Sequence, residues 1–249
     1  ADISAMNGLT VSGPINVGTA QNVTLGSANG SITGSGLVTG NVLNVNAKGD
    51  VTLSTNVASL TANITGTGNL SITERDGLQI NAANVTTSGG LVNITAGYAA
   101  PGTLNGAGFV NAAGGNVTLR NTKGAITFTA NAQQVVGNVL NVTAQNSSAL
   151  NTNVNTLVAN ITNNGSTLTI NEANSLTAIG TNVATNNGDI SITLATGSLT
   201  GTGNIVAGTG NVTLNASQGG ITLNTSTGQV SGNVLRSEEH TSELQSPCN

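Results

Sequence analysis

Apolar and polar residues alternate in short segments along the whole chain. Residues 51–53, 70–72 and 190–192 each place one Thr or Ser between two aliphatic residues. A period of two is the signature of a β-strand, because successive side chains point to opposite faces. Clusters of Gly, Asn, Asp and Ser close the segments, and these residue types favour turns. No stretch shows helical periodicity, so the sequence predicts many short strands and almost no α-helix.

The segments themselves recur at a long interval. The string Gly-Asn-Val-Leu-Asn-Val occupies residues 40–45 and returns at residues 137–142, and its first four letters return at residues 232–235. The copies are therefore about 95 residues apart, and a fixed period of this kind is typical of stacked repeat architectures. A second string, Asn-Val-Thr-Leu, lies upstream of each copy, at residues 22–25, 116–119 and 211–214.

A shorter spacing lies inside the long one and predicts the size of a coil. The Ile of a Gly-x-Ile-Thr string follows each Asn-Val-Thr-Leu, as Ile32 follows Val23. Apolar segments about every ten residues give a coil of ~20 residues, and five such coils would account for the long period. A coil this small buries its aliphatic side chains only by stacking on neighbours ~4.8 Å away.

We therefore expect an all-β fold over residues 1–235, a single-stranded parallel β-helix or β-solenoid with ~20-residue coils and a ~95-residue long repeat. Asn residues at matching places in successive coils are expected to form ladders of side-chain amides. The alternative is a disordered linker rich in Gly, Asn and Thr. The regular supply of β-branched residues argues against it.

The last 14 residues, 236–249, break the pattern and interrupt the third Gly-Asn-Val-Leu string. They hold the single His of the chain, His240, and the single Cys, Cys248. Their sequence resembles the conceptual translation of a common sequencing adapter, so we expect this tail to be non-native. A genuine polar terminus is the alternative. We expect residues 1–235 to be an internal segment of a longer protein.

The charge and the composition limit the classes of partner that this segment could bind. Only 6% of the residues are charged and 1% are aromatic, which fits a thin aliphatic core. The basic residues before the tail are Lys48, Arg75, Arg120 and Lys123. Four scattered cations do not make the positive surface that nucleic acid requires. No apolar run approaches the ~20 residues of a membrane helix, so we expect no nucleic acid and no membrane span for this segment.

Candidate chemistry is sparse. Without the tail the chain contains no His and no Cys, so we expect no Ser-His or Cys-His pair and no zinc site with the usual ligands. Glu74 and Asp76 are two residues apart, and Glu172 recurs at the position that the repeat assigns to Glu74. In the second repeat Asn174 replaces Asp76. We expect these groups to lie in solvated turns, with a weak cation site as the alternative, and we assign no catalytic residue, no cofactor site and no metal site.

Asn-x-Ser/Thr sequons are frequent, and we expect most of them to reflect the composition of the strands, with glycosylation as the alternative. They include Asn22, Asn63, Asn69, Asn84, Asn93, Asn116, Asn141, Asn160 and Asn211.

One insertion interrupts the regular spacing. Ile94 and Val117 are 23 residues apart, whereas the equivalent Ile192 and Val212 are 20 apart. The extra residues fall around Gly97–Gly102, a segment that contains Tyr98 and Pro101. Insertions in solenoids form surface loops and sometimes bind ligands, so we expect a surface loop here.

The Gly-Asn-Val-Thr-Leu and Gly-x-Ile-Thr-Leu strings, at ~20 residues per coil, resemble the repeat region of filamentous haemagglutinin-like exoproteins over residues 1–235. These are large surface adhesins of Gram-negative bacteria, exported by two-partner secretion or as autotransporter passengers. The resemblance implies a right-handed parallel β-helix and an extracellular or cell-surface location. It also implies adhesion to host or bacterial surface receptors or glycans, and an outer-membrane secretion partner for the parent protein. The family's N-terminal secretion domain is not seen here, and no binding residue carries over.

Three functions remain open. The first, which we expect, is a non-catalytic structural or adhesive shaft segment of such an adhesin. The second is a carbohydrate-active β-helix enzyme, which would need Glu74, Asp76 and a further carboxylate in one groove. The third is an ice- or surface-binding solenoid, which needs Thr-x-Thr in aligned ranks. The Thr-x-Thr strings at residues 65–67, 167–169 and 225–227 do not recur in every coil.

Overall fold

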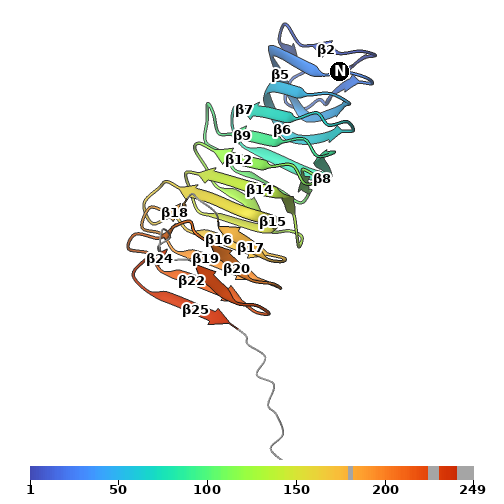
Figure 1. Ribbon diagram of the computed structural model, residues 1–249. Coiled ribbons are helices and arrows are strands. Elements are labelled where there is room, and N and C mark those ends of the chain that lie inside the picture. Colours follow the sequence, from blue (N-terminus) through green and yellow to red (C-terminus); the bar gives the residue numbers. More distant parts are fainter. Residues whose placement is uncertain (179–181, 224–229, 240–249) are drawn as a thin grey trace, which may run out of the picture.

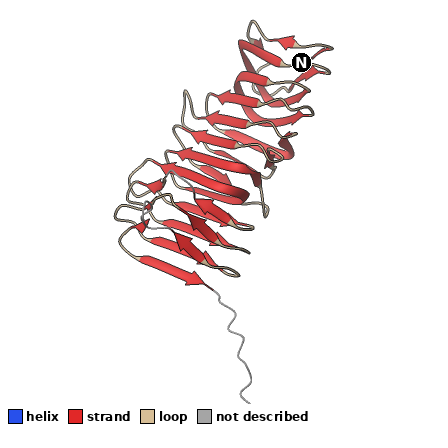
Figure 2. Ribbon diagram, viewed as in Figure 1, coloured by secondary structure: helices blue, strands red, loops and turns tan. Residues whose placement is uncertain are grey.

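The computed structural model describes residues 1–178, 182–223 and 230–239. Over these residues the chain winds into an elongated stack of coils made of strands, turns and loops, with no helix (Figures 1 and 2). The strands of successive coils pair in parallel, as β-solenoids require. The predicted all-β parallel β-solenoid is confirmed.

The strands that build the coils are short, apart from five long ones (β5, β6, β8, β14 and β15) that run through corners. In chain order they are β1 (Asp2–Ala5), β2 (Leu9–Thr10), β3 (Ile15–Asn16), β4 (Val23–Ser27), β5 (Ile32–Ala47), β6 (Val51–Ile64), β7 (Leu70–Glu74), β8 (Leu78–Thr87), β9 (Val92–Ala96), β10 (Leu104–Gly106), β11 (Val110–Asn111), β12 (Val117–Asn121), β13 (Ile126–Phe128), β14 (Val135–Ala144), β15 (Ser148–Ile161), β16 (Leu168–Glu172), β17 (Leu176–Ala178), β18 (Val183–Thr185), β19 (Ile190–Leu194), β20 (Leu199–Gly201), β21 (Ile205–Val206), β22 (Val212–Ala216), β23 (Ile221–Leu223), β24 (Val230–Ser231) and β25 (Leu235–Glu239).

Most coils consist of one longer strand of about five residues, which we call the wide strand, and two shorter strands. β16, β17 and β18 are an example. Residues that pair between neighbouring coils are 17 positions apart at Leu140 and Leu157, but 26 apart at Leu78 and Leu104. The predicted coil of ~20 residues is therefore confirmed as a typical length. The turns take up the variation, so the stacked strands keep their register.

Aliphatic side chains fill the interior of the stack. The alternating pattern of the sequence places every second strand residue inside, as the buried and partly exposed positions of β7 and β19 show. The core contains mainly Val, Leu, Ile and Ala, and Phe128 is the largest fully buried side chain. Each fully buried aliphatic side chain stabilises the fold by ~1.5–3 kcal/mol, so stability accumulates coil by coil.

The long repeat spans four and a half coils, and the expectation of five coils is wrong. From Val23 in β4 the chain crosses to Ile32, which lies on another side of the same coil. The ladder then rises four coils from Ile32 to Val117, the equivalent of Val23. Several coils in this part are longer than 20 residues, so ~95 residues complete fewer turns. Equivalent strings consequently lie on alternate sides of the rod.

The side of the rod that carries the wide strands differs from one long repeat to the next. β7, β9 and β12 stack in one column, which continues through the second half of β15 to the short strands β17 and β18. The wide strands β16, β19 and β22 instead continue the column of the short strand β13. The change occurs at the long strands β5–β6 and again at β14–β15, where the chain runs through a corner without a break.

Close packing between coils explains the Gly of the repeated string. A Cβ on Gly137 would lie 2.8 Å from the carbonyl oxygen of Gly115 and 3.0 Å from Cγ2 of Val117. A Cβ on Gly232 would meet its equivalent neighbours, the Gly210 oxygen and Val212 Cγ2, at the same distances. The Gly of the string therefore lies where two coils approach closely, and the approach is closest in the second and third copies.

The pairing extends past the boundary assigned to the tail. β25 pairs with β22 from Leu235 to Glu239, although Leu235 is 55% exposed. At the inward position that pairs with Leu214, this strand carries Ser237 instead of an aliphatic residue. The non-native origin of residues 236–249 stays a prediction, and His240 and Cys248 lie outside the described residues.

Candidate functional site

Two glutamates occupy equivalent corners of the solenoid. Glu74 ends the wide strand β7 and Glu172 ends the wide strand β16. The expectation that they lie in solvated turns is wrong, because Glu74 is 0% exposed and Glu172 is 1% exposed. Each occupies the last inward position of its strand, and the alternation Leu-x-Ile-x-Glu in the sequence was the signal that could have revealed this.

Hydrogen bonds occupy both oxygens of the Glu172 carboxyl group. Oε2 accepts a 2.7 Å bond from the Thr152 hydroxyl and a 3.2 Å bond from the Val154 amide. Oε1 accepts a bond of 3.0 Å from the amide of Ala173 and one of 3.3 Å from the amide of Asn174. Buried polar groups are stable when all of them are paired in this way.

The Glu74 carboxyl group has the same arrangement. Oε2 accepts a 3.1 Å bond from the amide of Val57, and Oε1 accepts a 2.8 Å bond from the amide of Arg75. Val57 faces the gap between β7 and β8, because the pairing of β6 with the next coil stops at Thr55 and resumes at Ser59. The carboxylate therefore replaces the missing backbone acceptor at the corner where the wide strand has changed sides.

Burial raises the pKa of the Glu74 and Glu172 carboxyl groups above the ordinary value. Hydrogen bonds from a Thr hydroxyl and from backbone amides act in the opposite direction on each pKa, and burial outweighs them. Both groups are thus less acidic than a solvated glutamate.

The carboxylates that the enzyme alternative invokes are only partly brought together. Asp76 follows Glu74 in the same turn, and its amide lies 3.5 Å from Oε1 of Glu74. Glu172 belongs to a distant coil, since strands β9, β12, β14 and β15 intervene. Within residues 1–178, 182–223 and 230–239, no group of three or more His, Cys, Asp or Glu residues could hold a metal ion.

The insertion Gly97–Gly102 forms a surface loop, as expected. Tyr98 is 67% exposed. The amides of Ala99 and Ala100 donate to the carbonyl oxygen of Arg75, at 2.7 and 2.8 Å. The ammonium group of Lys123 donates a 2.7 Å bond to the carbonyl oxygen of Ala99. The loop is therefore tied to the coils on both sides, and its binding of a ligand stays a prediction.

The outward positions of the wide strands form three polar lanes, each of which runs over several coils. Their residues are mainly Thr, Ser and Asn, and they are aligned by the register of the parallel strands. The first lane consists of Asp2, Ser4, Thr24, Gly26, Asn44, Asn46, Thr61 and Asn63. The second lane consists of Thr52, Ser54, Ser71, Thr73, Asn93, Thr95, Thr118, Arg120, Asn141 and Thr143. The third lane consists of Asn151, Thr169, Asn171, Ser191, Thr193, Thr213 and Asn215.

Asparagine ladders connect neighbouring coils, which confirms that expectation. Nδ2 of Asn171 donates a 2.9 Å bond to Oδ1 of Asn151 in the third lane. Beside it, Asn174 donates a 2.9 Å bond to Asn153, and Asn153 donates a 2.8 Å bond to Gln133. These contacts hold exposed amides in fixed orientations, so the outer surface is ordered as well as the core.

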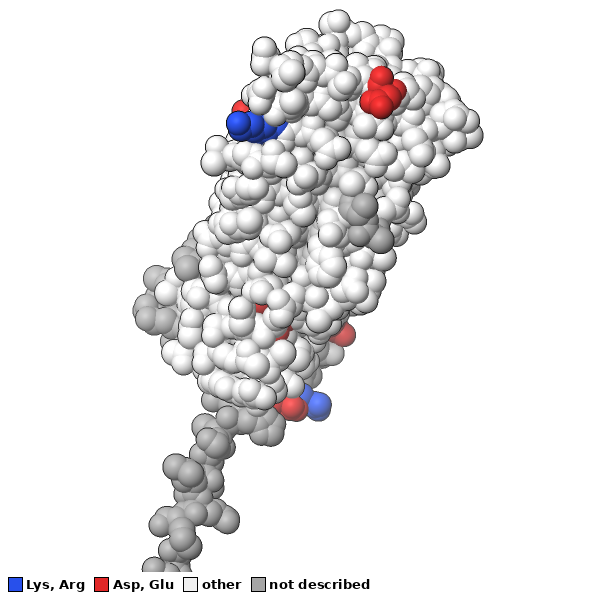
Figure 3. Space-filling view, turned by 90° about the vertical axis from the view of Figure 1, so that its right-hand side faces the viewer, with Lys and Arg blue, Asp and Glu red and all other residues white. Residues whose placement is uncertain are grey.

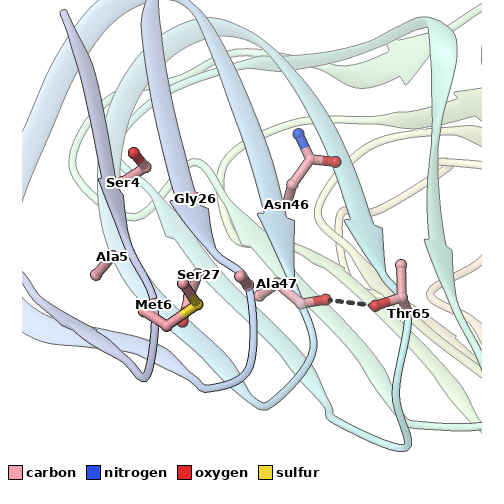
Figure 4. Close-up of a pocket in the computed structure, with 9 residues that line it drawn as sticks. Ser4, Ala5, Met6, Gly26, Ser27, Asn46, Ala47 and Thr65 are labelled. Atoms are coloured by element: carbon pink, nitrogen blue, oxygen red, sulfur yellow. Dashed lines mark hydrogen bonds between the residues drawn. The ribbon is translucent and has the colours of Figure 1, made fainter.

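A shallow groove lies on each of the three lanes. The first has a volume of about 510 Å³ and crosses Ser4, Gly26 and Asn46. Figure 4 shows these residues on three neighbouring strands, together with the bond of 3.4 Å from the Thr65 hydroxyl to the Ala47 carbonyl. The grooves of the second and third lanes measure about 340 and 380 Å³. Their polar linings include Asn141, Thr143 and Asn160 in the second, and Asn151, Asn171 and Thr193 in the third.

The surface is almost free of charge. Figure 3 shows one face of the rod on which acidic and basic side chains form a few separate spots. Within the three lanes, Asp2 at the end of the first and Arg120 in the second are charged, and β25 continues the third lane with Arg236 and Glu238. The grooves therefore offer hydroxyl groups, amides and small methyl groups to a ligand.

Two other expectations concern exposed Thr and Asn residues. The Thr-x-Thr strings at 65–67 and 167–169 do not stack on each other in neighbouring coils, since the first follows β6 and the second leads into β16. The third string, at 225–227, lies outside the described residues. Among the sequons, Asn69 uses its side-chain oxygen to accept a 2.8 Å bond from the Leu91 amide. The expectation that most sequons reflect the composition of the strands stays a prediction, with glycosylation as its alternative.

No known protein family, curated protein or solved structure matches this chain. In the part of the chain that the structure describes, no helix is long and apolar enough to cross a membrane.

Proposed function

We propose that this chain is a structural or adhesive shaft segment of a bacterial cell-surface adhesin, similar to the filamentous haemagglutinin-like exoproteins. In this role it acts without catalysis. It separates a binding part of the parent protein from the cell and offers its own faces for weak, repeated contacts.

The observation that carries the proposal is the uninterrupted stack of coils. The ladder runs from β1 to β25, and its interior is filled with aliphatic side chains. Such a stack lengthens in proportion to the number of repeats, and each coil contacts mainly its two neighbours. That property suits a spacer whose length is set by the number of repeats.

Two features support the proposal, one on the surface for adhesion and one in the interior for a role without catalysis. The grooves are shallow and lie on repeated polar lanes, so a partner would meet many similar contacts along the rod. The buried glutamates have their oxygens bonded to the Thr152 hydroxyl and to backbone amides, which gives them a role in holding the corners.

Cells that make the protein provide the test. Antibodies raised against the purified chain are expected to label intact cells, and removal of residues 1–235 in frame is expected to lower the attachment of those cells to a surface. Replacement by an unrelated β-solenoid of equal length is the matched control for spacing alone. Labelling only after the cells are made permeable, or attachment that is unchanged by the removal, would overturn the proposal.

A further inference from the structure

We propose that the three polar lanes bind an extended, uncharged, β-linked polysaccharide. The inference rests on the proposed adhesive role and gives that role a ligand class. It is carried by the chemistry of the lanes, their spacing, the position of the grooves and the alternation of the lanes around the rod.

The chemistry of the lanes matches a polymer of hydroxyl groups. Thr and Ser hydroxyls both donate and accept hydrogen bonds, and Asn amides do the same through separate atoms. A neutral ligand leaves no buried charge unpaired on a surface that is nearly free of charged residues. A highly charged polymer would gain few ion pairs there, because the charged residues along the lanes are confined to Asp2, Arg120 and the end strand β25.

The spacing of the lanes suits a long repeating ligand. Outward residues such as Ser71, Asn93 and Thr118 stack directly on one another. The strands that carry them are ~4.8 Å apart, which is close to the length of one sugar residue in an extended β-linked glucan. Successive sugars would therefore meet successive coils, and many weak contacts would add up to useful affinity.

The grooves mark where the polymer would lie. In the third lane, Asn151, Asn171 and Thr193 line one groove over three successive strands. The bond between Asn171 and Asn151 fixes both amides, so little side-chain freedom is lost when a ligand binds. Ala173 and Ala195 add methyl groups beside the amides, and these suit the apolar faces of a sugar ring.

The alternation of the lanes adds a second property. The second lane follows the column of β7 and β12, whereas the third follows the column of β16 and β22. A rod with lanes on different sides can hold two polymer strands at once, so it can bridge them.

The test uses the complete chain and microcrystalline cellulose. We expect the chain to sediment with cellulose and to bind equally at low and high salt, because the contacts are uncharged. Thr193→Arg in the third lane and Asn141→Arg in the second are expected to weaken binding, roughly tenfold when combined, because linked contacts are lost. We expect the fold to tolerate arginine at these positions, since Arg120 already occupies an equivalent outward position.

Matched controls carry the same substitution outside the lanes. Gln79→Arg lies at the start of the long strand β8 and Thr200→Arg lies on the three-residue strand β20; neither residue belongs to a lane, and we expect both variants to bind as the unchanged chain does. Arg120→Thr is expected to strengthen binding by removing the charge from the second lane. Thermal unfolding of every variant separates a loss of binding from a loss of fold.

Several outcomes would overturn the inference. They are no sedimentation with cellulose, chitin or β-1,3-glucan, binding that disappears at high salt, or equal losses in lane and control variants. Adsorption to ice crystals that the lane variants abolish, without binding to cellulose, would assign the lanes to ice instead. Each of these results is compatible with surface labelling of intact cells and with their attachment. The shaft proposal is therefore tested separately from the polysaccharide proposal.

Discussion

At the scale of single residues, small differences between equivalent positions decide whether the polar groups at a corner of the coil find hydrogen-bond partners. Ser27, Asn121 and Ala216 occupy the same place in the three repeats. Nδ2 of Asn121 donates to the carbonyl oxygens of Gly102 and Ala125, at 2.9 and 2.8 Å. Ser27 is buried, and its shorter side chain leaves the hydroxyl without a partner.

This comparison makes a prediction for the first corner. Ser27→Asn is expected to stabilise the protein by about 1 kcal/mol, because the longer side chain can reach the carbonyl groups of Asn7 and Ser31, the equivalents of those that Asn121 binds. Asn121→Ser is expected to destabilise it by about 1–3 kcal/mol, because the Gly102 carbonyl loses its side-chain donor and the Ala125 carbonyl keeps only the amide of Leu104. Urea denaturation measures both changes. A loss of stability with Ser27→Asn would contradict the equivalence of the corners.

The buried glutamates predict an unusual dependence of stability on pH. Burial raises the pKa of Glu74 and Glu172 in the folded state above the ordinary 4.5, so their ionisation opposes folding. Their contribution to stability is complete below the unfolded pKa and is lost as the pH rises through the folded pKa. The free energy of unfolding is therefore expected to be higher near pH 4 than near pH 7.

The double variant Glu74→Gln with Glu172→Gln is the control for this effect. It is expected to lose most of the difference in stability between pH 4 and pH 7, because neither amide titrates. Denaturant titrations at four pH values measure it. A wild-type protein that is more stable at pH 7, or a variant with the same pH dependence, would show that other groups control the effect.

At the scale of elements, the approach of two coils at the repeated glycine makes a third prediction. Gly137→Ala is expected to destabilise the protein by about 1–3 kcal/mol, because the new Cβ would meet backbone of the preceding coil. Gly13→Ala is the matched control, since a Cβ there would have nothing within 4 Å. Its effect is expected to stay within about 0.5 kcal/mol. Equal losses in the two variants would mean that the glycines serve only the turns.

The strands themselves could be predicted from the sequence, because inward and outward residues alternate in segments such as Leu70–Glu74 and Ile190–Leu194. The burial of Glu74 was missed, because Glu74 and Asp76 flank Arg75 at a strand end, and three charged residues in a row suggest an exposed turn. The glutamate is inside because the corner above Val57 lacks a backbone acceptor. That lack depends on how two coils align, which a local pattern does not contain.

At the scale of the whole molecule, the sequence shows the length of the long repeat but not the number of coils that it contains. Turns of different length, such as the loop Gly97–Gly102, change the number of residues per coil. A period of ~95 residues is then compatible with either four and a half or five coils, and only the register of the ladder distinguishes them. The alternation of the polar lanes follows from the half coil, so it could not be foreseen.

The most direct test of the account is the removal of one complete repeat. Deletion of residues 43–139 joins Val42 to Leu140 and restores the Gly-Asn-Val-Leu-Asn-Val string at the junction. Small-angle X-ray scattering then compares the two chains. We predict an unchanged cross-section and a rod shorter by about 22 Å, since four and a half coils of ~4.8 Å each are lost. A scattering curve from an unfolded or thicker particle would contradict a solenoid that is built from interchangeable repeats.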